Sequence, residues 1–251
     1  MLLIKQIRQG LLLLLALGCS SPGVIDQDIV RPGPDEPYLE KIPGPLLKSF
    51  NSVQDALLAA CDKIIVKPNA VAGRRDQPNF DIYWRVGSEY CAWIYYTPDQ
   101  KYELSKLTDQ SRVDPANRRK TCHLPPVVED RRHPPESIKY ICALHNHLFD
   151  DPVSPDDVKY IVSQVHDHGF ESETKDGVTR LSTVVFFSNN RSAPTCDGFY
   201  QYIPATSQIL KWTHEREGWG CEQTGRVIWL EGDMQFSIEE MRAPCPKGAM
   251  P

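Results

Sequence analysis

Long apolar runs, internal repeats and clustered positive charge are largely missing from this chain, and each absence narrows what it can be. The leading apolar run, Leu11 to Leu17, is too short to span a bilayer, which needs about 20 residues. No internal repeat is visible, and the length beyond the N-terminal region suits one domain. The net charge is -5, and basic residues cluster only at 118–120 and 131–132. This balance argues against a nucleic-acid partner.

A Cys-x-x-Cys spacing is also missing, so we do not expect a structural zinc knot. The chain has 8 cysteines, of which Cys19 lies in the N-terminal segment discussed below. The others are Cys61, Cys91, Cys122, Cys142, Cys196, Cys221 and Cys245. In an oxidising compartment most of these should pair and leave at least one thiol free, with the connectivity open.

The first 19 residues resemble a bacterial lipoprotein signal. Lys5 and Arg8 give a charged start, and the sequence Ala16-Leu17-Gly18-Cys19 after the apolar run resembles a lipoprotein cleavage box with Cys19 as the acylated residue. The alternative is an ordinary secretory signal with an incidental cysteine. Ser20, where an Asp would be the contrary signal, resembles an outer-membrane address in Gram-negative bacteria. We therefore expect a lipid-anchored protein of the cell envelope, facing the periplasm or the surface.

The remaining chain divides into an expected tether and one expected domain. Residues 20–47 hold six prolines and little periodic hydrophobicity, which predicts an extended tether. Residues 48–251 are expected to form a single domain, with a polar, proline-rich insertion at about 98–137 that wraps the site. Helices are predicted after Ser52 and over 155–168, the latter ending at Gly169. Strands are predicted at 80–86, 91–97, 138–145, 181–187, 198–203, 209–213 and 227–230. The pattern predicts an α+β (α/β layered) domain, a mixed sheet flanked by helices.

The most informative segment is 145–157, His-Asn-His-Leu-Phe-Asp-Asp-Pro-Val-Ser-Pro-Asp-Asp. On a strand, His145 and His147 point to the same face because side chains alternate. Ser154 followed by proline is typical of a helix start, and it places Asp157 in the first turn. Two histidines and a carboxylate give three protein ligands and an open fourth position, as in a catalytic zinc site.

This segment resembles the JAMM motif of JAB/MPN metalloproteases, which is a distant Glu, then His-x-His, a spacer and Ser-x-x-Asp. The spacer here has six residues where the family commonly has seven, and it begins with Leu148 where the family commonly has proline. Glu89, in the sequence Glu89-Tyr90-Cys91-Ala92-Trp93-Ile94-Tyr95, fits the context of the family's Glu. Residues 50–56, Phe-Asn-Ser-Val-Gln-Asp-Ala, are similar to a helix of JAB-like domains in bacterial secreted and toxin-associated proteins.

The resemblance implies a JAB/MPN-like fold of cytidine deaminase-like architecture and a defined role for each site residue. It implies that His145, His147 and Asp157 bind Zn²⁺, that Glu89 is the general base and that Ser154 steadies the oxyanion. The implied activity is that of a zinc-dependent peptidase or isopeptidase acting on a peptide or isopeptide substrate.

Other residues compete for these roles. Alternative carboxylates are Asp150, Asp151 and Asp156 for the metal, and Glu103, Glu129 and Glu136 for the base. His166 and His168 follow Asp157 at too great a distance along the helix to share its metal, so we expect them to be structural. Cys142 is expected on the opposite strand face from His145 and therefore in the core or in a disulfide, and not as a metal ligand. The rival functions are a JAB-like binding module without activity and a toxin- or immunity-associated envelope domain.

Overall fold

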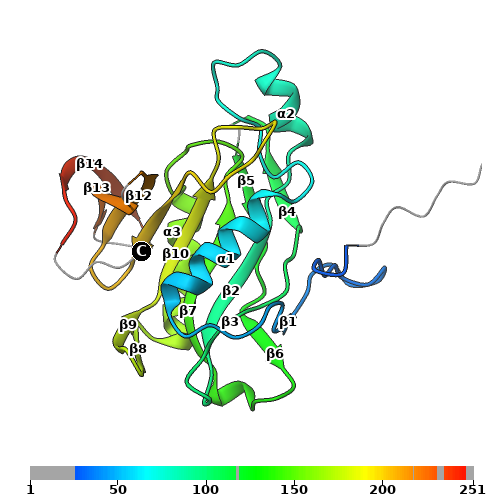
Figure 1. Cartoon of the computed structure of the whole chain (residues 1–251), viewed down its shortest axis with the longest axis vertical. Coiled ribbons are helices and arrows are strands. Elements are labelled where there is room, and N and C mark those ends of the chain that lie inside the picture. Colours follow the sequence, from blue (N-terminus) through cyan, green and yellow to red (C-terminus); the bar gives the residue numbers. More distant parts are fainter. Residues whose placement is uncertain (1–25, 117–118, 217, 231–234, 247–251) are drawn as a thin grey trace, which may run out of the picture.

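One large β-sheet organises the molecule (Figure 1). The computed structural model describes residues 26–116, 119–216, 218–230 and 235–246. The strand order in the sheet is β14-β13-β12-β11-β10-β7-β2-β3. The first four of these strands along the chain are β2 (Cys91–Tyr96), β3 (Tyr102–Leu104), β7 (Lys139–Asn146) and β10 (Ser182–Phe187). The rest are β11 (Gly198–Ile203), β12 (Gln208–Glu215), β13 (Gly218–Trp229) and β14 (Phe236–Pro244).

The centre of the sheet is a parallel pair, and all other neighbours in it are antiparallel. β7 and β10 run parallel, with His145 opposite Val185. Between them the chain forms α3 (Pro155–His168) and the hairpin of β8 (Glu171–Thr174) and β9 (Gly177–Arg180). A parallel connection of this kind needs a crossover, which α3 supplies. The end of β7 and the start of α3 are thereby brought to the same edge of the sheet.

Two helices cover opposite faces of this sheet (Figure 1). Helix α1 (Val53–Ile65) packs its buried face on a core that includes Ala92 and Leu144. Helix α3 packs Val158 and Ile161 on the other face, beside Trp93, Ala143 and Val185. Successive side chains of β2 and β7 point to opposite faces of the sheet, and a helix covers each face. Both strands are therefore buried almost throughout.

The expected α+β (α/β layered) domain of JAB/MPN-like, cytidine deaminase-like architecture is wrong. The described chain is mostly β, with 40% strand and 17% helix, and its large mixed sheet is accompanied by three helices. The difference arises because the C-terminal part adds four antiparallel strands, β11 to β14, that no helix separates. Each of these strands pairs with its predecessor in sequence, which needs only short turns.

The predicted strand at 80–86 is also wrong, because this segment is helix α2 (Phe80–Val86). Its aromatic and β-branched composition favours a strand. The positions of Phe80 and Trp84, four residues apart, place both rings on one helical face, where they form a small core with Leu148 and Phe149. Tertiary contact with the loop after β7 therefore outweighs local propensity.

The tether predicted for 20–47 is wrong from Asp26 onward. Arg31 forms a two-pronged ion pair with Asp109, with a closest contact of 2.6 Å. Val30 donates a backbone hydrogen bond to Leu107. β1 (Lys41–Gly44) pairs in parallel with β6 (Val127–Asp130). Proline-rich composition resembles a linker, but these long-range contacts hold the segment on the domain.

Short strands also occupy part of the segment expected as an insertion at about 98–137. Besides β3 and β6, it contains the hairpin of β4 (Ser111–Asp114) and β5 (Arg119–Cys122) and the short 3-10 helix η1 (Pro135–Ser137). The β4–β5 hairpin reaches the candidate site described below.

The remaining predicted elements are confirmed within a few residues. Ser52 caps α1, and Ser154 caps α3, which ends at Gly169 with a φ of 79°. β7, β10 and β11 match the predictions for 138–145, 181–187 and 198–203. The predictions for 209–213 and 227–230 fall in β12 and β13.

Three disulfides join six of the described cysteines, as the cysteine count predicts. They are Cys61–Cys196, Cys91–Cys122 and Cys221–Cys245. Cys142 is the free cysteine of the described chain and lies buried in the core. Cys19 and the proposed signal segment lie outside the described residues. Within the described part of the chain, no helix has the length and apolar character to cross a membrane.

Candidate metal centre

The end of one strand and the start of one helix bring the predicted ligands together. His145 and His147 project from the end of β7, and Asp157 comes from the first turn of α3. One ligand atom from each residue lies within 4.8 Å of the others, and all three side chains are buried. His145 Nε2 lies 3.2 Å from Asp157 Oδ1, and His147 Nε2 lies 3.5 Å from Asp157 Oδ2. The group could therefore hold a metal ion.

These separations match what zinc requires. With zinc–ligand distances near 2.0–2.2 Å in tetrahedral geometry, neighbouring ligand atoms lie about 3.4 Å apart. His145 Nε2 is buried and makes no hydrogen bond despite its short contact with Asp157. A buried nitrogen left without a partner is costly unless something else, such as a cation, uses its lone pair. The donor set therefore fits a bound dication.

Neighbouring groups orient two of the ligands. His147 Nδ1 lies 3.0 Å from the carbonyl oxygen of Asp151, which holds a proton on Nδ1 and would direct the lone pair of a neutral imidazole at Nε2 to a metal. Asp157 Oδ2 accepts a hydrogen bond from the Ser154 backbone at 2.6 Å, while Asp157 N donates to Ser154 Oγ at 3.2 Å. This reciprocal capping box fixes the carboxylate at the helix start, where the helix dipole favours negative charge.

The charges of this group are strongly coupled. Although burial opposes its ionisation, Asp157 has a pKa well below its ordinary range because His145 and His147 lie beside it. Burial likewise lowers the pKa of His147, but Asp157 and Glu89 outweigh it and raise that pKa to about 9. In the absence of a metal, an Asp157 carboxylate and a His147 imidazolium therefore stabilise each other.

Glu89 lies at the same site. β2 and β7 are antiparallel with Cys91 opposite His145, so continuing the register by two residues places Glu89 beside His147. Its side chain is 3% exposed, and its Oε2 has no hydrogen-bond partner. Burial raises its pKa to about 8, with His147 opposing the shift. A buried carboxyl with a pKa near neutrality is suited to accept and release protons.

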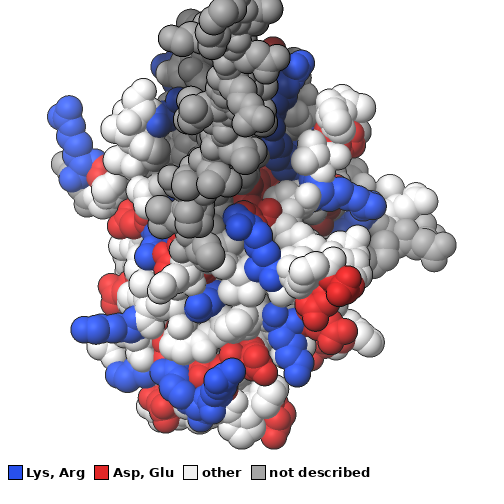
Figure 2. Space-filling model, turned by 90° about the vertical axis from the view of Figure 1, so that its right-hand side faces the viewer, with Lys and Arg blue, Asp and Glu red and all other residues white. Residues whose placement is uncertain are grey.

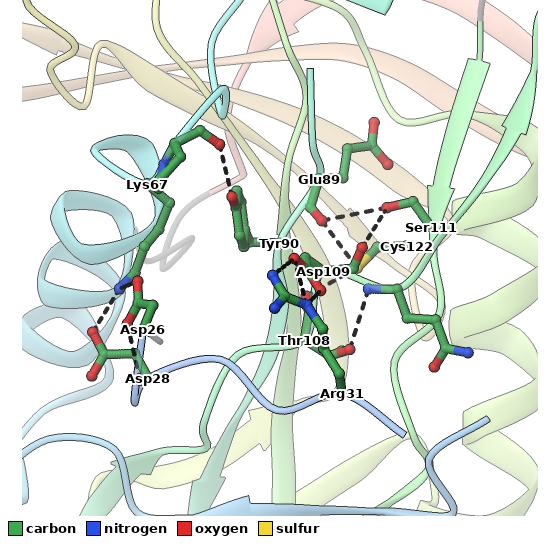
Figure 3. Close-up of polar contacts among 12 residues, drawn as sticks. Asp26, Asp28, Arg31, Lys67, Glu89, Tyr90, Thr108, Asp109, Ser111 and Cys122 are labelled. Carbon is green, nitrogen blue, oxygen red and sulfur yellow. Dashed lines mark hydrogen bonds and ion pairs between the residues drawn. The ribbon is translucent and has the colours of Figure 1, made fainter. Parts of the chain in front are cut away.

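The backbone of Glu89 is fixed from two sides. Figure 3 shows the side on which Ser111 lies. Its carbonyl accepts a hydrogen bond from Ser111 Oγ at 3.4 Å, and the next backbone N–H, of Tyr90, donates to Asn146 Oδ1 at 2.7 Å. Figure 3 shows the Glu89 carboxyl directed away from the Arg31–Asp109 pair. The Cys91–Cys122 disulfide links the strand after Glu89 to β5.

Asn146 and Lys120 are positioning residues that the sequence analysis missed. Asn146 donates to the carbonyls of Ala70 and Ser88 and accepts from Tyr90, so it holds the Glu89 strand against β7. Its place between two histidines, facing an apolar core, is the signal that could have revealed a structural amide. Lys120 Nζ donates to the carbonyls of Arg85 and Gly87 and is 7% exposed. No local pattern indicates this role, because the hairpin reaches the site only in the folded state.

The competing residues lie elsewhere or have other partners. Asp150 accepts from Tyr200 and Lys211, while Asp151 pairs with Arg75. Asp156 contacts Thr121 at the outer side of α3. The alternatives to Glu89 lie in other elements: Glu103 binds Arg132, Glu129 is on β6 and Glu136 is in η1.

His168 and Cys142 have structural roles, as expected, while His166 lies exposed on α3. His168 stacks on Tyr140 with ring centroids 3.7 Å apart, and its Nε2 lies 3.0 Å from the carbonyl of Pro126. Cys142 Sγ lies 3.4 Å from Ser182 Oγ in the core.

A small hollow borders the site. Its volume is about 20 Å³, and Glu89, His147 and Ser154 are among its lining residues. A space of this size holds about one water molecule. A larger hollow of about 460 Å³ lies between α1 and the β12–β13 region, away from the metal ligands. We assign the chemistry to the small hollow because the titratable groups converge there.

Comparisons with known protein families, curated proteins and solved structures found no match to this chain. The functional argument therefore depends on the geometry of the site and on the sequence motif.

Proposed function

We propose that this chain is a zinc-dependent amide hydrolase of JAMM type, a peptidase or isopeptidase. The observation that carries the proposal is the convergence of His145, His147 and Asp157 beside Glu89, whose buried carboxyl has no hydrogen-bond partner on Oε2. The JAMM-like spacing of these residues supports the same chemistry. The proposal concerns the site, because the mostly β architecture differs from the fold that the motif implied.

Each residue has a distinct part in the proposed reaction. A bound zinc ion would lower the pKa of a water molecule towards neutrality and polarise the amide carbonyl. Glu89 would accept one proton from the attacking water molecule as the water oxygen bonds to the amide carbon. Glu89 then passes the proton to the amide nitrogen as the C–N bond breaks, which leaves an acid and an amine.

The Ser154 hydroxyl can donate a hydrogen bond to the oxyanion that forms during the proposed reaction. Its Oγ accepts from Asp157 N, so the hydroxyl proton is not used in the cap. The hydroxyl lies in the wall of the same hollow as Glu89 and His147. It can therefore donate to the oxygen that gains negative charge when the amide carbon becomes tetrahedral.

The proposed location is the bacterial cell envelope, with Cys19 as the site of lipid attachment. The lipobox-like sequence at residues 16–19 supports this. The substrate would then be a peptide or isopeptide of the cell envelope, within reach of the membrane. We do not propose a nucleic-acid partner, because the net charge is -5 and Figure 2 shows Lys and Arg interspersed with Asp and Glu on the face it presents.

The test is turnover of a quenched-fluorescent peptide library by the full chain loaded with zinc. Glu89→Gln preserves shape and should retain zinc, while turnover should fall by about a hundredfold or more, the scale of general-base catalysis. Glu129→Gln, a change on exposed β6 surface, is the matched control and should leave turnover unchanged. Zinc binding without any cleavage would instead favour the binding-module alternative, and equal turnover by Glu89→Gln would exclude Glu89 as the base.

A further inference from the structure

Some residues that line the hollow beside the candidate metal ligands have no role in the proposed reaction. Besides Glu89, His147 and Ser154, its lining includes Trp84, Phe149 and Arg119. The two aromatic residues belong to the small core under α2. Arg119 is the first residue of β5 and is exposed, so its guanidinium lies at the mouth of the site.

The other charged side chains around this hollow already have partners. Asp151 pairs with Arg75 at 3.1 Å, and the Arg75 guanidinium also lies over the Phe149 ring. Lys120 binds two backbone carbonyls and is the cation that faces Glu89. Among the residues that the structure describes, the Arg119 side chain makes no ion pair or hydrogen bond. The charge of Arg119 acts on Asp151, which already pairs with Arg75, so two arginines share one carboxylate at the mouth of the hollow.

The backbone that carries Arg119 is held firmly. Its neighbour Lys120 is anchored under the site, and Cys122 forms a disulfide with Cys91, two residues after Glu89. Register pairing with β4 places Arg119 opposite Asp114. The strand fixes where the Arg119 side chain starts, and its planar guanidinium can bind a carboxylate in a bidentate manner.

We propose that Arg119 is a specificity residue that binds a carboxylate of the substrate next to the amide to be cleaved. This inference rests on the proposed function, and it narrows the substrate class to peptides or isopeptides with an acidic side chain or a free α-carboxylate beside the scissile bond. Because Arg75 and Arg119 share the single carboxylate of Asp151, the mouth attracts a further carboxylate and rejects a substrate that places a cation there.

Zinc-binding probes of matched length test this inference without turnover. The carboxylate series is the monohydroxamates of succinic, glutaric and adipic acids, and the neutral series is butyro-, pentano- and hexanohydroxamic acids. Each probe is titrated calorimetrically into the zinc-loaded full chain. The hydroxamate group is expected to bind the metal, and the rest of the probe to extend towards Arg119. At least one carboxylate probe should bind roughly tenfold more tightly than its neutral partner, the scale of a charged hydrogen-bonded contact.

Variants assign the effect to Arg119. Arg119→Gln should abolish the preference for the carboxylate probe, and Arg119→Lys should restore part of it because the charge returns without the planar guanidinium. Arg226→Gln is the control of equal charge change, since Arg226 is exposed on β13, four strands from β7. It should retain the full preference.

The outcomes separate this inference from the proposed function. If neutral and carboxylate probes bind the zinc-loaded protein equally, or if Arg119→Gln keeps the preference, the specificity role is wrong while the metal site stands. If no hydroxamate binds better after zinc loading than before it, the metal site itself is wrong, and the inference is overturned with it.

Discussion

Ser154 and Asp157 hold each other at the start of α3, with the Ser154 N–H donating to Asp157 Oδ2 and the Asp157 N–H donating to Ser154 Oγ. One pair of residues thus both starts the helix and orients the carboxylate that we propose as a metal ligand. The local energetics of helix capping and the geometry of the site therefore depend on the same two hydrogen bonds.

Ser154→Ala should affect stability and rate but not zinc content. Loss of the cap should reduce the free energy of unfolding by about 1 kcal/mol, and loss of the hydroxyl donor should lower turnover. Ser52→Ala is the matched control, because Ser52 caps α1 through Asp55 N, away from the site. It should lose similar stability in denaturant titration and keep full turnover. If Ser154→Ala turned over substrate as fast as Ser52→Ala, Ser154 would have no role in the reaction.

The metal-free protein should lose stability as the pH rises from about 5 to about 9. Glu89 has its pKa raised from 4.5 to about 8 by burial, and His147 has its pKa raised from 6.5 to about 9, against burial, by Asp157 and Glu89. In this window both groups hold more proton in the folded than in the unfolded state, so unfolding becomes easier as protons are removed. Urea titrations of the chelated protein should show this decline in the free energy of unfolding. Glu89→Gln should remove the share of the pH dependence that comes from Glu89. Constant stability across this window would contradict the burial argument.

Titration of the unreduced, denatured protein should find about one free thiol per chain, apart from Cys19, whose sulfur is blocked if it is acylated. The reactive residue should be Cys142, so Cys142→Ala should remove the signal. In the native protein this thiol should be unreactive, because burial raises its pKa to about 12. Seven free thiols would contradict an oxidising compartment.

Lipid attachment can be tested separately from catalysis. Cys19→Ala should abolish incorporation of labelled palmitate and release the protein from the membrane fraction, because a lipoprotein anchor requires that sulfur. Cys142→Ala serves as a control for loss of a cysteine and should remain membrane-bound. Unchanged partitioning of Cys19→Ala would leave the envelope anchor without support.

The metal motif could be recognised from sequence because its geometry is local. His145 and His147 share a strand face by alternation, and Ser154-Pro155 marks the start of α3. The step from β7 to α3 is short, so residues close in sequence meet in space. Local rules of strand and helix therefore sufficed to predict that these three side chains, the candidate ligands, lie together.

The features that the sequence did not predict correctly depend on contacts between residues far apart in the chain. Residues 26–47 have the composition of a linker, but Lys67 binds Asp26 and Asp28 across 41 and 39 residues (Figure 3). Helix α2 has the composition of a strand, yet its shape is decided by packing of Phe80 and Trp84 on the loop after β7. Arg119 reaches the site only through the β4–β5 hairpin and its disulfide. No local sequence pattern predicts these long-range contacts.

The central claim is that His145, His147 and Asp157 bind zinc, and metal content tests it most directly. The purified full chain, loaded with zinc and freed of excess metal, should carry about one zinc per chain by mass spectrometry. His145→Ala, His147→Ala and Asp157→Ala each remove one of three ligands and should lose it, whereas His166→Ala, on the exposed end of α3, should keep it. A wild-type chain that carries no zinc, and that is indistinguishable from His145→Ala, would contradict the account.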